Sequence, residues 1–188
     1  PGADIKFVGK QRKTYRDKCG MLGLSADFTL DEVSEPEILL VPGGGGADAA
    51  AEDTEITDWV AAVHAKTRWT TSVCTGALIL GGAGVLQGLK ATTHWRAMET
   101  LATKYGANAT TERVVQQGKV ITAAGVSSGI DMALTLAALE AGDDIAKAIQ
   151  LGIEYDPQPP FNAGNFSKAP ADRVAMWRAG LNKTQRPT

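Results

Sequence analysis

The protein is a chain of 188 residues, 44% hydrophobic and 21% charged, a balance typical of a folded globular domain rather than a disordered chain. Its formal net charge is −2, so a basic surface for nucleic acid or for an anionic membrane is not expected. No apolar run approaches the roughly 18 residues that a membrane-spanning helix needs. The two cysteines, Cys19 and Cys74, lie in different contexts and do not indicate a disulfide scaffold, which favours a reducing, cytoplasmic location.

Strands are expected to alternate with helices along the first half of the chain. The run 37–41 is almost wholly apolar, which predicts a strand buried on both faces. The other elements expected here, in chain order, are a strand over 5–9, a short antiparallel excursion within 10–24, a helix from Asp53 or Thr54, a buried strand over 68–73 and a helix from Ala77.

The second half continues the alternation. Its expected elements are a brief extended piece over 91–93, a helix over 95–105, a hairpin of 113–116 with 120–123, a helix from Ser127 or Ser128 with Ile130, Ala133, Leu134 and Ala137 on its inner face, a helix from Asp143, and a final short helix within 171–181. This order predicts one α/β domain over 1–188: a three-layer αβα sandwich with a mostly parallel sheet and helices on both faces.

The strongest chemical signal is Cys74, between a predicted buried strand and a predicted helix. The sequence Ser72-Val73-Cys74-Thr75-Gly76 predicts a sharp turn that exposes the side chain at its apex, a nucleophile elbow. Gly76 lets the helix pack close to the strand, and the helix N-terminus favours the thiolate form of the cysteine. The competing interpretation is an inert buried cysteine, which is common for lone cysteines.

A glycine loop, 42–46, follows the strand over 37–41. Loops at the carboxyl ends of neighbouring parallel strands meet, so the N–H groups of Gly44 and Gly45 are candidates to face Cys74. With the Thr75 N–H they would stabilise negative charge on a bound atom. A plain tight turn remains an alternative. A phosphate loop is disfavoured because neither of its glycine patterns is present.

Two further residues are ambiguous from their local sequence. His94 follows a short strand, where it would orient or exchange a proton with Cys74, or cap a helix. Asp131 lies one turn into a predicted helix, as a buried acid near the site or as a first-turn residue that suits the helix dipole. His64 is interpreted as a surface residue. No metal-ligand spacing is present, so a metal site is not predicted.

Four blocks of the sequence together resemble the ThiJ/PfpI superfamily, which has the flavodoxin-like fold of class I glutamine amidotransferases. The blocks are Leu40-Val41-Pro42-Gly43-Gly44, Ser72-Val73-Cys74-Thr75-Gly76, Ala91-Thr92-Thr93-His94-Trp95 and Gly129-Ile130-Asp131-Met132-Ala133-Leu134. The segment from Glu154 to Gly164, with Lys168-Ala169-Pro170, is similar to the isocyanide (isonitrile) hydratase branch of that superfamily.

The resemblance implies a homodimeric enzyme that acts on a small molecule without a cofactor. Cys74 would add to the isocyanide carbon, and water would release an N-substituted formamide. The backbone of Gly44 and Thr75 would polarise the bound intermediate, with His94 and Asp131 near the site. Peptidase-like members carry histidine directly after the cysteine, whereas this chain has Thr75, which argues against a cysteine protease.

The resemblance also implies a difference at the amino terminus. Members of the family begin with a strand that delivers an acidic residue to the cysteine, and this sequence starts at what would be their second strand. The expectation is therefore an amino-terminally incomplete domain. Three alternative functions remain open: a glyoxalase- or deglycase-like enzyme acting on small dicarbonyls, the ligand-sensing domain of an AraC-type regulator, and a redox sensor oxidised at Cys74.

Overall fold

The computed structural model describes residues 2–17 and 19–179. Residues up to Lys147 form one compact unit, and those from Ala148 onward belong to a second. Within the described ranges, no helix has the length and apolar character needed to cross a membrane.

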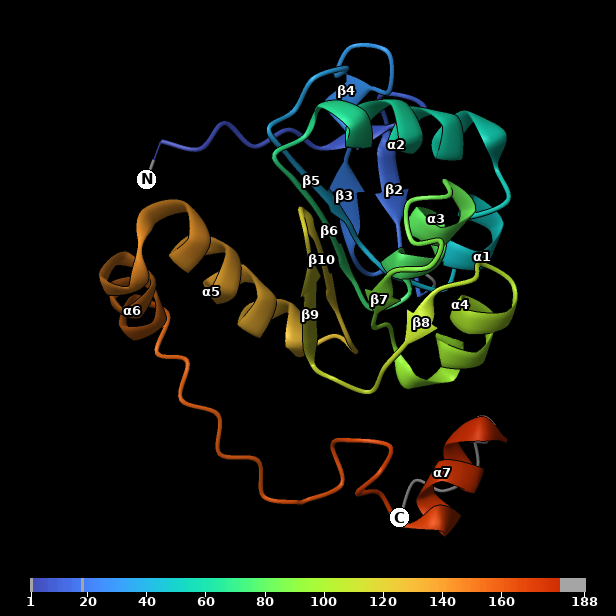
Figure 1. Ribbon diagram of the computed structural model, residues 1–188, viewed down its shortest axis with the longest axis vertical. Helices are drawn as coiled ribbons and strands as arrows, with labels where there is room; N and C mark the ends of the chain where they lie inside the picture. The colour runs from blue at the N-terminus through green and yellow to red at the C-terminus, as the bar shows by residue number, and fades with distance from the viewer. Residues whose placement is uncertain (1, 18, 180–188) are drawn as a thin grey trace. The chain divides into compact units, whose positions relative to one another are not determined.

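A four-stranded sheet forms the centre of the first unit. Its strands stand in the order β5 (Ile38–Val41), β6 (Trp69–Val73), β10 (Val120–Ala123) and β9 (Val114–Gln117), and the first three are parallel (Figure 1). β9 runs antiparallel to β10, which is the predicted hairpin. The carboxyl ends of β5, β6 and β10 therefore lie at one edge of the sheet, where the loops after them meet.

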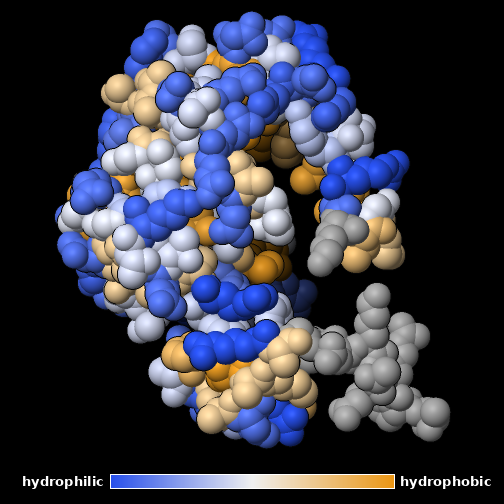
Figure 2. All heavy atoms as spheres, turned by 90° about the vertical axis from the view of Figure 1, so that its right-hand side faces the viewer, coloured by the Kyte–Doolittle hydropathy of each residue, from blue (hydrophilic) through white to orange (hydrophobic). Residues whose placement is uncertain are grey.

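Helices lie on both sides of this sheet, so the α/β sandwich with a mostly parallel sheet is confirmed. One side carries α1 (Ala47–Ala50), α2 (Thr54–Lys66), α3 (Gly76–Gly82) and, after the 3-10 turn η1 (Trp95–Ala97), α4 (Met98–Thr103); the other carries α5 (Ser128–Ala141) (Figure 1). The predicted cap of α2 is present, because the Asp53 side chain accepts a hydrogen bond from the Glu55 N–H. Figure 2 shows hydrophilic and hydrophobic residues intermixed on the face it presents.

Among the described residues, three small two-stranded sheets accompany the central one. They pair β1 (Val8–Gly9) with β4 (Phe28–Thr29), β2 (Thr14–Arg16) with β3 (Gly23–Ser25), and β7 (Lys90–Ala91) with β8 (Asn108–Ala109). The β2–β3 hairpin confirms the antiparallel excursion predicted within 10–24. The strand expected over 5–9 is reduced to β1, and β4 and β8 were not predicted, since two-residue strands carry too little periodicity to be read from a sequence.

The expectation that the strand over 37–41 is buried on both faces is wrong. Leu39 and Val41 are buried in the main core with α2 and α3, whereas Ile38 and Leu40 are 38% and 51% exposed. The physical reason is the position of α5, which packs against β10 and β9, so that its cover of that face stops short of β5.

The inner face predicted for α5 is also wrong. Ser128 and Met132 are its buried residues, and Leu136 packs against the cluster of Ile121, Ala123 and Met132, whereas Ile130 is 39% exposed. Apolar residues surround this helix on all sides, so helical spacing alone does not identify the face that packs against the sheet.

The second unit is largely irregular. α6 (Asp143–Gly152) begins in the first unit and ends in the second, and Glu154, after it, has a left-handed φ of 51°. An irregular proline-rich segment separates α6 from α7 (Ala171–Arg178), as predicted. Residues 180 and 181 of the predicted last helix lie outside the described residues.

Candidate active site

Cys74 occupies the turn between β6 and α3 with a left-handed φ of 58°. Residues with a side chain rarely adopt this conformation, and they keep it where their surroundings hold it in place. The Cys74 N–H donates hydrogen bonds to the carbonyl oxygens of Ala123 (3.0 Å) and Ala124 (2.8 Å), at the end of β10. The residue is half-buried, so this turn has the geometry of the expected elbow at the carboxyl edge of the sheet.

Gly76 makes this tight turn possible. A Cβ atom at residue 76 would lie 2.2 Å from the Val41 carbonyl oxygen and 2.9 Å from that of Pro42. Both obstacles are backbone atoms, which cannot swing aside as a side chain can. Only glycine therefore lets α3 begin this close to the end of β5, as the sequence predicts.

The glycine loop after β5 meets the elbow, as expected. A Cβ atom at Gly43 would lie 2.8 Å from the Cys74 Cβ, and the Gly44 N–H donates to the Thr75 Oγ1 at 2.9 Å. The Thr75 hydroxyl in turn lies 3.2 Å from the Gly44 carbonyl oxygen, to which it donates. The Gly44 N–H is thus directed at a side chain of the protein, a role the sequence did not indicate.

The main-chain N–H groups of Thr75 and Gly45 differ from that of Gly44. Within residues 2–17 and 19–179, the N–H groups of Thr75 and Gly45 donate no hydrogen bond that meets ordinary geometry. A main-chain N–H group that is not already hydrogen-bonded can stabilise negative charge that develops near a nucleophile, as in acyl-transfer reactions.

Two contacts place the segment around His94 beside the elbow: one is made by the preceding residue, Thr93, and the other by the loop after β10. The Thr93 Oγ1 donates a 2.8 Å hydrogen bond to the Cys74 carbonyl oxygen, and a Cβ atom at Gly125 would lie 3.2 Å from the His94 Cδ2. The His94 Nδ1 also accepts from the Arg96 N–H at 3.4 Å, capping η1. The interpretation of His94 as a helix cap is therefore confirmed, whereas its action on Cys74 stays a prediction.

Electrostatics favour the neutral form of His94. Partial burial, and secondarily the charge of Arg96, lower the pKa of His94 from its usual 6.5. With Nδ1 accepting a hydrogen bond, the neutral ring carries its proton on Nε2. His94 is thus a neutral Nε2–H donor at neutral pH.

Asp131 lies in the first turn of α5 and forms an ion pair with Arg113. The Arg113 side chain also donates to the Ser127 Oγ at 3.4 Å, and the Arg113 carbonyl accepts from the Ala124 N–H at 2.9 Å. This arrangement ties the start of α5 to the residue that immediately precedes β9. The contacts favour the structural interpretation of Asp131 over that of an acid at the sulfur.

Sequence reasoning missed two residues beside the elbow. Thr93 was part of a quoted motif without a role, although it contacts the Cys74 carbonyl directly. Gly125 makes room for His94. The available signal was the pair Thr92-Thr93 after a short strand, but only the fold decides which hydroxyl turns toward the elbow.

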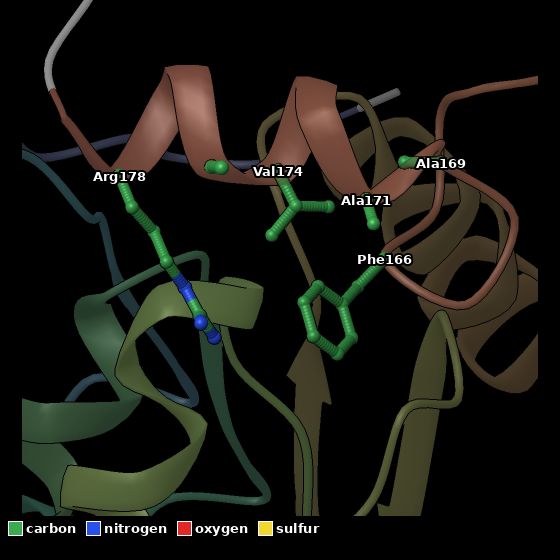
Figure 3. Close-up of a pocket in the computed structure, with 6 residues that line it drawn as sticks. Phe166, Ala169, Ala171, Val174 and Arg178 are labelled. Atoms are coloured by element: carbon green, nitrogen blue, oxygen red, sulfur yellow. The ribbon is translucent and has the colours of Figure 1, made fainter.

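Features away from the elbow are less suited to this chemistry. Cys19 is exposed and belongs to the turn of the β2–β3 hairpin. Across the described part of the chain, no group of three or more His, Cys, Asp or Glu side chains is placed to hold a metal ion. A pocket of about 520 Å³ beside α7 is lined by Phe166, Ala169, Ala171, Val174, Ala175 and Arg178. Figure 3 shows this pocket in close-up.

Known proteins are similar to this chain over most of its length. The profile of the DJ-1/PfpI family matches residues 1–139. The isonitrile hydratase of Pseudomonas putida is 40% identical over 171 residues, which are 91% of this chain and 74% of the hydratase. A crystal structure of a ThiJ/PfpI family protein from Pseudomonas syringae is similar with a TM-score of 0.89 and 41% identity, over 95% of this chain and 74% of that one. The HTH-type transcriptional regulator CdhR of Pseudomonas aeruginosa is 26% identical over 126 residues, 66% of this chain and 37% of the regulator.

Proposed function

Because the chain belongs to the DJ-1/PfpI family, we propose that it is a cofactor-independent hydratase that converts isocyanides into N-substituted formamides. The observation that carries this proposal is Cys74, a half-buried residue with a left-handed backbone at the carboxyl edge of the sheet. The similarity to an isonitrile hydratase over 91% of the chain supports the choice of substrate class.

The proposed reaction has two steps. The Cys74 sulfur attacks the isocyanide carbon, the proton of the thiol passes to that carbon, and the product is a thioimidate in which the carbon is bonded to both sulfur and nitrogen. A water molecule then adds to the same carbon. The carbon–sulfur bond breaks, one proton of the added water passes to the Cys74 sulfur and the other to the nitrogen, and the N-substituted formamide leaves. One water is consumed, and nothing is oxidised or reduced.

Groups around Cys74 have distinct proposed roles. The Thr75 N–H would polarise the intermediate, and the hydrogen bond from the Gly44 N–H to the Thr75 hydroxyl would orient that hydroxyl. His94, neutral with its proton on Nε2, is proposed to donate a hydrogen bond to the reacting groups and to keep its proton. Asp131 acts on the site indirectly, through its ion pair with Arg113.

The direct test is an assay for formamide production from an alkyl or aryl isocyanide. The wild-type protein should produce formamide, Cys74→Ala should produce none above background, and Cys19→Ala should match the wild type because Cys19 lies in an exposed hairpin turn. Formamide production that persists in Cys74→Ala would refute the proposal. Turnover of methylglyoxal without turnover of an isocyanide would favour the dicarbonyl enzyme instead.

Ligand sensing is the second candidate, favoured by the similarity of 66% of the chain to a transcriptional regulator. A sensing domain would bind a small molecule at the same edge of the sheet and release it unchanged. Calorimetric binding of an isocyanide, with no formamide formed over hours, would support sensing over catalysis.

The proposed enzyme acts as a homodimer, on the strength of the family resemblance. Sedimentation velocity at micromolar concentration should give the mass of two chains. A single species with the mass of one chain would contradict this proposal without affecting the chemistry.

A further inference from the structure

We infer that Thr93 is a positioning residue, whose hydroxyl holds Cys74 in the conformation that the reaction needs. The inference rests on the proposed role of Cys74 as the nucleophile. The Thr93 Oγ1 donates to the Cys74 carbonyl oxygen at 2.8 Å, and Thr93 is 1% exposed. A buried donor of this kind holds its acceptor without competition from water.

Cys74 is held by its main chain from two sides. Its N–H is bound to the carbonyl oxygens of Ala123 and Ala124, and its carbonyl oxygen is bound by Thr93. The helical hydrogen bond to the same carbonyl, from the Ala77 N–H, is long at 3.5 Å. The Thr93 hydroxyl is therefore the closer donor to this carbonyl, and it fixes the peptide that follows the sulfur-bearing residue.

The segment that carries Thr93 is itself fixed and leads directly to His94. The N–H of the preceding residue donates to the buried Thr122 Oγ1 at 2.9 Å, and His94 lies against Gly125. Since Thr93 and His94 are consecutive, one segment determines both the carbonyl of Cys74 and the position of the imidazole. Loss of the Thr93 hydroxyl is expected to loosen the elbow relative to this histidine.

Thr92 provides a matched control. It is also a fully buried threonine, yet its Oγ1 has no hydrogen-bond partner among the described residues. Replacing it with valine removes a hydroxyl of the same type, one residue away, and leaves the Thr93 hydrogen bond intact. A difference between the two variants therefore isolates the hydroxyl at Thr93 from general packing of this segment.

The experiment compares Thr93→Val, Thr93→Ser and Thr92→Val, all in a Cys19→Ala background so that one thiol remains. We expect Thr93→Val to lower kcat by about 10- to 100-fold with KM nearly unchanged, because a small misplacement of a reacting group costs this much. The rate of Cys74 alkylation by iodoacetamide should fall as well, across a pH series from 6 to 9. Thr93→Ser, which keeps the hydroxyl, should restore both rates, and Thr92→Val should match the parent.

Three outcomes would overturn the inference: a folded Thr93→Val with both rates within twofold of the parent, an equal loss in Thr92→Val, or failure of Thr93→Ser to restore the rates. If Thr93→Val does not fold, Thr93→Ser and Thr93→Ala form a second pair that differs only by the hydroxyl, and equal rates in that pair would overturn it. Alkylation does not depend on isocyanide turnover. A parent protein that makes no formamide would therefore refute the proposed function, while the alkylation rates would still test Thr93.

Discussion

The two ends of strand β6 are both fixed by threonine hydroxyls, but to different effect. At the amino end, the Thr70 Oγ1 lies 2.7 Å from the Thr67 Oγ1 and 2.8 Å from the His64 Nδ1. The Lys119 ammonium group donates to the carbonyl oxygens of His64 and Thr67 at the end of α2. At the carboxyl end, the Thr93 hydroxyl holds the carbonyl of Cys74, which is a half-buried residue.

The comparison shows how one strand serves both stability and chemistry. At the amino end, the hydroxyls and the imidazole satisfy one another and the ammonium group satisfies main-chain carbonyl oxygens, so their contribution is to the free energy of unfolding. At the carboxyl end, the hydrogen bonds are made to the main chain of a residue in an unfavourable conformation, so they position a reactive side chain. Substitutions at the amino end should change stability and leave activity, whereas substitutions at the elbow should change activity.

The largest effect is expected from Gly76→Ala at the carboxyl end. Its Cβ would lie 2.2 Å from the Val41 carbonyl oxygen, so α3 or β5 must shift. We expect a loss of about 3 kcal/mol in the free energy of unfolding, at the upper end for an overpacked site, together with loss of Cys74 reactivity. Urea denaturation and iodoacetamide alkylation measure the two effects. Gly46→Ala, where an added Cβ has nothing within 4 Å, is the control; equal losses in the two variants would contradict the close-approach argument.

A smaller effect is expected from Lys119→Met at the amino end. The substitution keeps an unbranched side chain but removes the charged donor to the carboxyl end of α2. The expected cost is about 2 kcal/mol in the free energy of unfolding, because charged hydrogen bonds and the helix dipole both favour the lysine. Cys74 alkylation should be unchanged. Lys147→Met, at a side chain 71% exposed, should cost almost nothing. Slower alkylation of Cys74 in Lys119→Met would contradict the distinction between an amino end of β6 that affects stability and a carboxyl end that affects activity.

The smallest effect is a dependence of stability on pH through His64, which the structure places half-buried rather than on the surface. Burial, and secondarily the charge of Lys119, lower the pKa of His64 from 6.5. The unfolded chain then binds a proton more readily than the folded one, so this contribution to stability is complete above pH 6.5 and is lost as the pH falls through the lowered pKa. Urea denaturation at pH 7.5 and 5.5 should show a smaller pH-dependent loss in His64→Asn than in the wild type, with part of the loss remaining because the pKa of His94 is lowered too. An equal or larger loss in His64→Asn would contradict this assignment.

The elbow and the order of its neighbours could be predicted from the sequence because their signals are local. A β-branched run before Cys74, a glycine two residues after it and a glycine loop after another apolar run each restrict the backbone within a few residues. Parallel pairing then brings those loops to one edge of the sheet, which the observed contacts of Gly43 and Gly44 with the elbow confirm.

Contacts between distant segments could not be predicted in the same way. The partner of Asp131, the capping of α2 by Lys119 and the choice of Thr93 over Thr92 depend on how strands lie in register, which no single segment encodes. Ile38 and Leu40 are exposed for a different reason. An apolar strand predicts burial, but whether these side chains are buried depends on how far α5 extends over the sheet. The prediction of the packing face of α5 was wrong because apolar residues occupy all sides of that helix.

The central claim, that Cys74 forms a covalent intermediate with an isocyanide, can be tested by mass spectrometry of the protein quenched with acid during turnover. The account predicts that the peptide containing Cys74 gains the mass of one isocyanide molecule, while the peptide containing Cys19 is unchanged. Sustained formamide production with no adduct on Cys74 after rapid quenching, or with the adduct on Cys19 alone, would contradict it.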